Sequence, residues 1–339
     1  MAKNTHIYYD VSLHNTNTAP KLAFLNDNRT TPLVSNPSNY HLSVVRFTIP
    51  TSYIPIFKWA DAGSNTPDNN YYSVTINNSQ VYLIYVPQNT TPQSALNTDY
   101  LFIYSYQQFI DAINVALNTA FIASAPAGVT APPYMIFNSV TGICSLIAQT
   151  GYTAHSIYFN QPLFLFFDNF KCNRIGYSQA TGKDVKIYIA NTGANDYAGH
   201  PPGYALAGAV DSYIMAQEYD SLFLWNGVRS LVFTSSGLTI ADEALNINNN
   251  LSISSSNISR KILTDFEFNI QSGISNNTLR SYIQYNPTAE YRLIDLTSTS
   301  PIYLFDIQIY FQMKDLTLIP LYIMPDESLS MKILFRKKM

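Results

Sequence analysis

The sequence predicts a mainly β protein, a single eight-stranded jelly roll that carries a large α+β insertion domain. Three observations lead to this prediction. Tyr and Phe, which favour pleated strands, number 26 and 19 among 339 residues, and much of the remaining polarity comes from turn-forming Asn, Ser and Thr. Several segments near the two ends alternate apolar and polar residues with the period of a strand. One segment in the middle has the apolar spacing of a long helix.

The low charge of the chain points to a role in assembly. Charged residues make up 12% of the sequence and aromatic residues 14%. Because charges are depleted and tyrosine is enriched where surfaces become buried between subunits, this composition favours a large protein–protein interface. The formal net charge of −3 supplies no field that would attract nucleic acid, so we expect no specific nucleic-acid binding.

The strands of the jelly roll are expected at both ends of the chain. Near the N-terminus they are residues 6–13 and 40–49, and in the second of these Val45, Phe47 and Ile49 are expected to share the core face. After the middle of the chain, residues 221–225 and 228–234 are expected to form a hairpin around Asn226-Gly227, a dipeptide that tolerates the positive φ angles of a tight turn.

Three terminal strands complete the count. They are residues 262–270, 303–311 and 329–335, and in the second of them Asp306 is expected on the wet face, opposite Phe305 and Ile307. About eight strands with long connections describe a jelly roll of two sheets. The predicted organisation is therefore a jelly roll of residues 1–58 and 217–339, with residues 59–216 inserted between its fourth and fifth strands as an outward-facing domain.

The inserted body is expected to have its own core. Residues 104–123 read as a helix, with Ser105 and Gln108 as a capping box and an apolar stripe of Phe109, Ile113, Leu117 and Phe121. Hairpins are expected from residues 72–76 with 81–86 and from residues 134–137 with 143–147. Residues 163–167 are apolar on both faces and are interpreted as a strand buried on both sides, and residues 191–208 as an exposed loop or boundary.

No pattern of catalytic or ligand-binding residues stands out in the sequence. Residues 176–183 depart from a phosphate-binding loop, because five residues separate the glycines and Asp184 stands where Ser or Thr should bind magnesium. The histidines lack zinc-binding spacing, and Cys144 and Cys172 form no metal or redox motif. The carboxylate pairs Asp242-Glu243 and Asp326-Glu327 leave a glycosidase open as a minor alternative. We expect a protein that is not an enzyme and needs no cofactor or metal.

The remaining signals concern location. The first residues have no apolar signal core, and residues 163–167, the longest apolar run, are far too short to span a membrane, so we expect neither secretion by a standard route nor membrane insertion. Two cysteines suit a reducing compartment. The only basic run is Arg336, Lys337 and Lys338, which we interpret first as a solvated chain end.

Several strings at both ends resemble the minor capsid, or penton, proteins of virophages and polinton-like viruses. The middle of the chain has no such match. The strings are LWNGVRSLVFTSSGL at residues 224–238, YNPTAEYRLIDL at 285–296, PIYLFDIQIYF at 301–311, SLSMKILFRKK at 328–338, YYDVSL at 8–13 and RFTIPTSYIPIF at 46–57.

The resemblance implies a structural virion protein made in the host cytoplasm. It implies a single jelly roll that forms a homopentamer at each icosahedral fivefold vertex and contacts trimers of the major capsid protein. It also implies an outward-facing insertion domain, which could meet a host receptor, and an inward direction for the basic end, where Arg336, Lys337 and Lys338 would approach the genome or an internal protein.

Two other functions stay open beside the penton. The same jelly roll could serve as a spike or lectin-like module that recognises a host glycan, because tyrosine-rich surfaces also suit sugars. A jelly-roll glycosidase would need a carboxylate pair facing a cleft. A major capsid subunit fits less well, because a double jelly roll needs a longer chain with a second set of strands.

Overall fold

The computed structural model describes residues 6–50, 54–61, 72–86, 100–170, 172–173, 184–189, 212–225, 227–241, 243–244, 259–267, 282–285, 292–314, 316 and 318–338. The fold is mainly β, as predicted, with one long helix. Chain contacts divide it into two compact units. The first consists of Met1–Ile54, Gly227–Asn269 and Thr278–Met339, and the second of Pro55–Asn226 and Ile270–Asn277.

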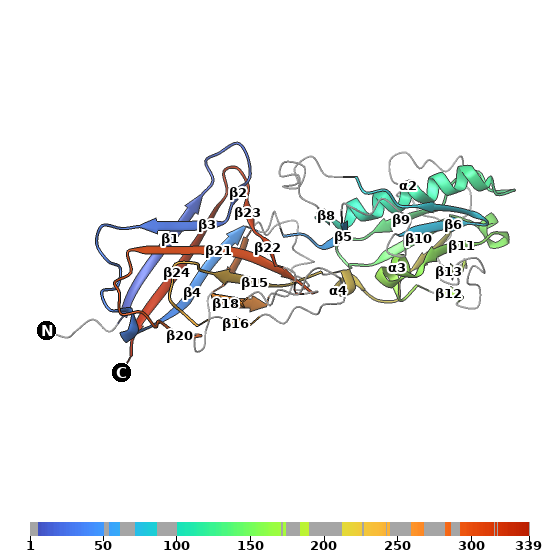
Figure 1. Ribbon diagram of the computed structural model, residues 1–339. Coiled ribbons are helices and arrows are strands. Elements are labelled where there is room, and N and C mark those ends of the chain that lie inside the picture. The colour runs from blue at the N-terminus through green and yellow to red at the C-terminus, as the bar shows by residue number, and fades with distance from the viewer. Residues whose placement is uncertain are drawn as a thin grey trace. The chain divides into compact units, whose positions relative to one another are not determined.

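The first unit contains two principal antiparallel sheets (Figure 1). One has the order β1-β24-β4-β19, with β20 also paired to β4. Its strands are β1 (His6–His14), β24 (Ser328–Lys337), β4 (Tyr40–Pro50), β19 (Tyr282–Tyr285) and β20 (Ile294–Asp295). The other has the order β18-β15-β21-β22, with β3 also paired to β21. Its strands are β18 (Ile262–Glu267), β15 (Val228–Thr234), β21 (Leu304–Met313), β22 (Leu318–Pro320) and β3 (Phe24–Asn28).

Two two-stranded sheets and one 3-10 turn also lie among the described residues of the first unit. Strand β2 (Lys21–Leu22) pairs with β23 (Tyr322–Ile323), and β16 (Glu243–Ala244) pairs with β17 (Ser259–Arg260). A short 3-10 turn, η1 (Pro37–Asn39), leads into β4.

The two principal sheets pack face to face through aromatic side chains. Phe47 of β4 lies 5.2 Å from Phe233 of β15, and Phe305 of β21 lies 6.2 Å from Phe335 of β24, measured between ring centroids. All four are buried. Alternate residues of each strand point to this core, which is the arrangement expected of a sandwich of two sheets. The predicted core residues of the last strand, Leu329, Met331, Ile333 and Phe335, are buried as expected.

The predicted core residues of β4, Val45, Phe47 and Ile49, are buried, and a β-bulge adds others to them. Lys332 is opposite Arg46 and the next residue, Ile333, is opposite Val44, so Val45 has no partner in the register. An extra residue changes which side chains point inward. Leu42 and Val44 are therefore buried in addition to the predicted Val45, Phe47 and Ile49, whereas a regular strand would have kept a single alternation through Val45.

The second unit combines three sheets with helix α2 (Tyr106–Ser124). The first has the order β14-β10-β9, from β14 (Ser212–Ala216), β10 (Cys144–Gln149) and β9 (Tyr134–Phe137). The second has the order β12-β13-β11-β6-β7, from β12 (Cys172–Asn173), β13 (Asp184–Ile187), β11 (Ile157–Asn160), β6 (Ser73–Ile76) and β7 (Ser79–Tyr82). Strands β5 (Phe57–Asp61) and β8 (Tyr100–Ile103) form the third.

Helix α2 lies along these strands and contacts β6, β7 and β9 (Figure 1). Phe109, Ile113 and Leu117 of the predicted stripe are fully buried. The predicted capping box is wrong in detail, because the Ser105 side chain makes no capping hydrogen bond and Gln108 Oε1 instead accepts from the backbone N–H of Tyr104 at 3.4 Å. The helix ends at Ala125, whose φ of 41° is left-handed.

Two predicted strands of the middle are helical instead. Residues 163–167 lie in α3 (Gln161–Phe164) and the 3-10 turn η3 (Leu165–Phe167), because Asn160 caps the segment by accepting from the N–H of Leu163 at 3.2 Å and Pro162 suits a first helical turn. Residues 222–225 form α4 (Leu222–Trp225), so the predicted hairpin is wrong in its first half, and Asn226 lies outside the described residues. A further 3-10 turn, η2 (Thr150–Ala154), precedes β11.

The predicted hairpins β6–β7 and β9–β10 are present. Ser73 and Thr75 of β6 are buried together with Val74 and Ile76, so both faces of this strand are covered. The core of this unit is rich in aromatic side chains. Trp225 is central to it, since its ring lies 5.2 Å from that of Phe109 and its indole N–H donates to the carbonyl of Phe166 at 2.8 Å.

Candidate functional site

The basic residues singled out from the sequence lie at the end of a central strand. Arg336 and Lys337 are the last two residues of β24, which is paired on both sides, to β1 and to β4. Arg336 is opposite His6 on one side and His41 on the other. The N–H of Lys338 then donates to the carbonyl of Asn39 at 2.8 Å. The sheet therefore holds the backbone of this chain end, while the side chains of Arg336, Lys337 and Lys338 are half-buried.

Lys338, directly after the end of β24, forms an ion pair with Asp295. Its Nζ lies 2.7 Å from Oδ1 of Asp295, and the same oxygen lies 3.1 Å from Nδ1 of His41. The hydrogen bond from Lys338, together with the positive charge of Lys338, holds the pKa of the Asp295 carboxyl below its usual value. Asp295 stays ionised at neutral pH and offsets part of the positive charge of the strand end.

A second charged row crosses the same sheet further along. Asp10, Lys332 and Arg46 are opposite one another on β1, β24 and β4. Oδ2 of Asp10 lies 3.3 Å from Nζ of Lys332, and its Oδ1 lies 3.6 Å from Arg46. The Lys332 ammonium also lies 5.7 Å from the ring centroid of Tyr8, within cation–π distance. Lys332 and Arg336 are four residues apart on β24, so their side chains point to the same face of the sheet. The basic groups of this face are Lys332, Arg46, Arg336 and Lys338, and they outnumber the carboxylates of Asp10 and Asp295.

The carboxylate pairs considered for a glycosidase give no such site among the described residues. Asp326 lies in a tight turn with a φ of 62°, and Glu327 Oε2 accepts from the N–H of Met324 at 3.3 Å, which closes that turn. Asp242 lies outside the described residues. Within the part of the chain that the structure describes, no group of three or more His, Cys, Asp or Glu side chains could hold a metal ion.

Cys144 and His155 are the other potentially reactive residues considered, and the contacts of both are those of structural residues. Burial raises the pKa of the Cys144 thiol, with a smaller contribution from the charge of Asp220, so this thiol stays protonated at neutral pH. His155 joins two loops, since Nδ1 lies 3.2 Å from the amide of Asn77 and Nε2 lies 2.9 Å from the carbonyl of Ala127. No helix in the described residues is long and apolar enough to cross a membrane.

Sequence reasoning missed the role of Asp306. It was expected to face water, yet its side chain is buried. The carboxylate accepts from the hydroxyls of Ser235 and Ser236 at 2.7 and 2.6 Å and from the backbone N–H groups of Ser236 and Gly237 at 2.8 and 2.7 Å. Burial acts to raise the pKa of Asp306, but these hydrogen bonds outweigh it and the pKa lies below its usual value. The run Ser235-Ser236-Gly237 directly after β15 was the available signal.

Comparison with known proteins identifies the class to which this two-sheet protein belongs. The family model described as Sputnik minor capsid protein V18/19 matches residues 7–337. The chain belongs to this family, and it is therefore a minor capsid protein of the virion. The match includes the middle of the chain, where the sequence strings above showed no resemblance.

Individual relatives give the same assignment. Structural protein V19 of Sputnik virophage is 32% identical over 208 residues, which cover 60% of this chain and 93% of V19. The V18 protein of Sputnik virophage is 40% identical over 127 residues, 32% of this chain and 76% of V18. A chain of the Sputnik virophage structure solved by cryo-EM has a TM-score of 0.79 and 31% identity, with 99% of each chain covered. The mavirus penton protein crystal structure has a TM-score of 0.69 and 17% identity, covering 98% of this chain and 99% of that one, and shares the fold.

Proposed function

We propose that this minor capsid protein is the penton capsomer, a homopentamer at the fivefold vertices of an icosahedral capsid that contacts trimers of the major capsid protein. The observation that carries the proposal is the order of the strands in the first unit. The likeness of the fold to the mavirus penton protein supports the same assignment. So does the scarcity of charge, 12% of residues, because subunit interfaces are depleted in charged side chains.

The strand order supports a single jelly roll. Eight strands form two facing sheets, β1-β24-β4-β19 and β18-β15-β21-β3. The first and last of them in the chain, β1 and β24, are neighbours, and long connections pass between the sheets, as in two nested Greek keys. The chain passes from this unit to the second after β4 and returns before β15, and the second unit otherwise takes only Ile270–Asn277, which supports an insertion. The inserted unit follows β4. This strand is the third of the eight sandwich strands, and it is the fourth strand of the chain because the short β2 precedes it.

Each unit has a part in the proposal. The jelly roll forms the ring and the shell contacts, and a ring that closes at five copies requires a heterologous interface. The inserted unit, predicted as residues 59–216, faces outward, where it meets a host receptor. Arg336, Lys337 and Lys338 face inward and approach the genome or an internal virion protein. Synthesis in the host cytoplasm completes the proposal.

The mass of the purified full-length chain in solution tests the assembly. Light scattering or mass photometry over a range of salt and protein concentration should give a species of five times the 38.1 kDa chain mass. A species that persists at three times the chain mass under all conditions would contradict the pentamer. It would favour a trimeric spike, the lectin-like alternative.

A further inference from the structure

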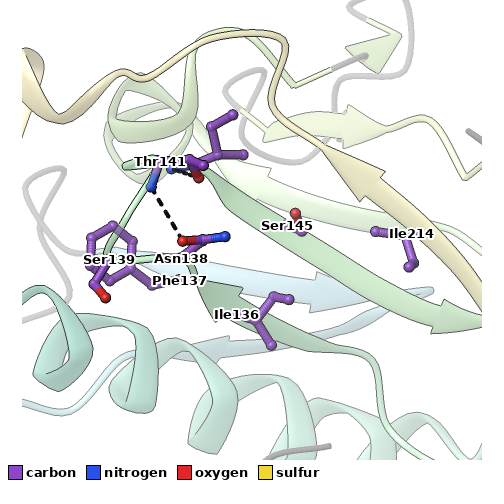
Figure 2. Close-up of a pocket in the computed structure, with 8 residues that line it drawn as sticks. Ile136, Phe137, Asn138, Ser139, Thr141, Ser145 and Ile214 are labelled. Atoms are coloured by element: carbon purple, nitrogen blue, oxygen red, sulfur yellow. Dashed lines mark hydrogen bonds between the residues drawn. The ribbon is translucent and has the colours of Figure 1, made fainter. Parts of the chain in front are cut away.

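We infer that the second unit contains a binding site for a neutral saccharide, in a pocket at the β9–β10 hairpin. The pocket has a volume of about 540 Å³, within the range that ligand sites occupy (Figure 2). The inference gives a ligand class to the receptor contact proposed above, and so rests on that part of the proposed function. It does not depend on the number of subunits in the capsomer.

The pocket lies on one face of the β14-β10-β9 sheet. The other face carries Met135 and Leu146, which belong to the buried core beneath α2, and the Asn114 side chain fixes β9 there through hydrogen bonds with the backbone of Met135 at 2.6 and 2.9 Å. Alternation in the strands turns Ile136 and Ser145, which are opposite each other, to the pocket side. The pocket floor is therefore held by a packed core.

The hairpin loop orients a hydrogen-bond donor toward the pocket. Oδ1 of Asn138 accepts from the backbone N–H groups of Val140 and Thr141 at 2.9 and 3.2 Å. Because only the amide oxygen can accept these bonds, the nitrogen must point the other way. Figure 2 shows the Asn138 oxygen turned to the loop backbone and the nitrogen turned away from it. Asn138 is one of the residues that line the pocket. No described residue accepts a hydrogen bond from this Nδ2.

The loop itself is fixed in this shape. The N–H of Asn138 donates to the carbonyl of Ile143 at 2.9 Å, and the N–H of Gly142 donates to the carbonyl of Asn138 at 2.8 Å. Gly142 has a φ of 72°, which favours glycine, and a Cβ there would lie 2.8 Å from the carboxyl carbon of Asp220. The donor is thus held in place before a ligand arrives, which lowers the entropic cost of binding.

The lining combines an apolar surface with neutral polar groups. Its apolar residues are Ile136, Phe137, Ile143 and Ile214, and its polar residues are Asn138, Ser139, Thr141 and Ser145. The ring of Phe137 packs against Tyr106 of α2, at 5.2 Å between centroids, and so contacts the core on the other side of the sheet. None of the lining residues is ionisable, so a charged ligand would lose its hydration without gaining an ion pair.

A sugar ring has the complementary chemistry. One side of a pyranose presents C–H groups that can lie on Ile136 and Ile214, and its edge carries hydroxyls that both donate and accept. The Asn138 amide supplies the donor, and the hydroxyls of Ser139 and Ser145 can act in either sense. A site of this size and polarity fits one or two neutral hexose units.

Titration of the full-length chain with defined sugars tests the inference. The probes are the methyl glycosides of glucose, galactose and mannose and the disaccharides maltose, cellobiose and lactose, followed by saturation-transfer NMR and calorimetry. At least one should bind with a dissociation constant of about 1 mM or tighter. Glucuronic acid and sialyllactose are the acidic comparison probes, and binding of these alone would overturn the inference, as would binding of no neutral probe.

Variants place the binding at this pocket. Asn138→Asp keeps the oxygen that the loop needs and removes the donor, so affinity should fall about tenfold, the equivalent of one lost hydrogen bond to a ligand. Ser139→Ala, at an exposed position, gives a second test if the first variant misfolds. Val140→Ala is the matched control, since Val140 belongs to the same loop, is 80% exposed and does not line the pocket. Unchanged affinity in folded Asn138→Asp and Ser139→Ala proteins would overturn the site.

The same samples separate this inference from the assembly. Mass photometry of the wild type and of each pocket variant reports the number of subunits. A pentamer that binds no sugar would contradict the saccharide site and support the penton assignment. A monomer that binds sugar through Asn138 would support the saccharide site and contradict the pentamer.

Discussion

The side chain of Asp306 connects the turn after β15 to the beginning of β21. Its carboxylate accepts two hydroxyl and two backbone donors from Ser235, Ser236 and Gly237, and it does so at a buried position. Gly237 is required by the close approach, because a Cβ there would lie 2.9 Å from Oδ1 of Asp306. Alternation along the strand predicted the wrong surroundings for this residue, since a one-strand pattern carries no information about a neighbouring turn that supplies donors.

Asp306→Asn should lower the free energy of unfolding by about 2–4 kcal/mol, because the amide replaces an acceptor by a donor that faces other donors. The pKa of Asp306 is lowered in the folded state, so the wild-type advantage is complete above the carboxyl's ordinary pKa of about 3.9 and is lost as the pH falls through the lower folded-state value. Urea unfolding of the chain and variant between pH 3 and pH 7 measures both effects.

Asp265→Asn is the matched control for that experiment. Asp265 lies on β18 of the same sheet, and its exposed side chain pairs with Arg292 at 2.9 Å. A surface pair of this kind contributes about 1 kcal/mol or less. Equal losses in the two variants would contradict the role assigned to Asp306.

At the scale of elements, sequence patterns succeeded for the longer strands and for the long helix. Strands β21 and β24 and helix α2 were predicted because their apolar residues recur with a clear period. The patterns failed in short apolar runs, where α3 and α4 were interpreted as strands, since four or five apolar residues suit either structure. The residues that cap these helices would have indicated helical structure. Asn160 is the N-cap of α3, and Asp220 accepts from the N–H of Leu222 at 2.7 Å at the start of α4. The bulge in β4 has no comparable sequence signal.

The end of β24 gives a prediction at the same scale. In virions, replacing Arg336, Lys337 and Lys338 together by Ala should reduce packaged DNA while vertex incorporation is retained, because the strand backbone is held by β1 and β4 whatever its side chains are. The charge-preserving variant Arg336→Lys, Lys337→Arg, Lys338→Arg is the control and should package normally. Quantitative PCR of nuclease-treated particles and immunoblots provide the two readouts. If the Ala variant matches the wild type in both, the inward role of these residues is wrong.

For the whole molecule, the sequence predicted the family from its two ends, and the family match covers residues 7–337. The mainly β fold followed from composition and strand patterns together. The saccharide pocket could not be predicted, because its lining joins a hairpin loop to Ile214 on β14, which lies far along the chain. Neither the symmetry of the capsomer nor its neighbours follow from a single chain, because both depend on surfaces of other subunits.

An icosahedral cryo-EM reconstruction of virions that contain this chain tests the central claim most directly. We predict density at each fivefold vertex into which five copies of the first unit fit, with β1-β24-β4-β19 and β18-β15-β21-β3 resolved as two facing sheets. Density for this chain only at threefold or general positions, with another protein at the vertices, would contradict the penton assignment.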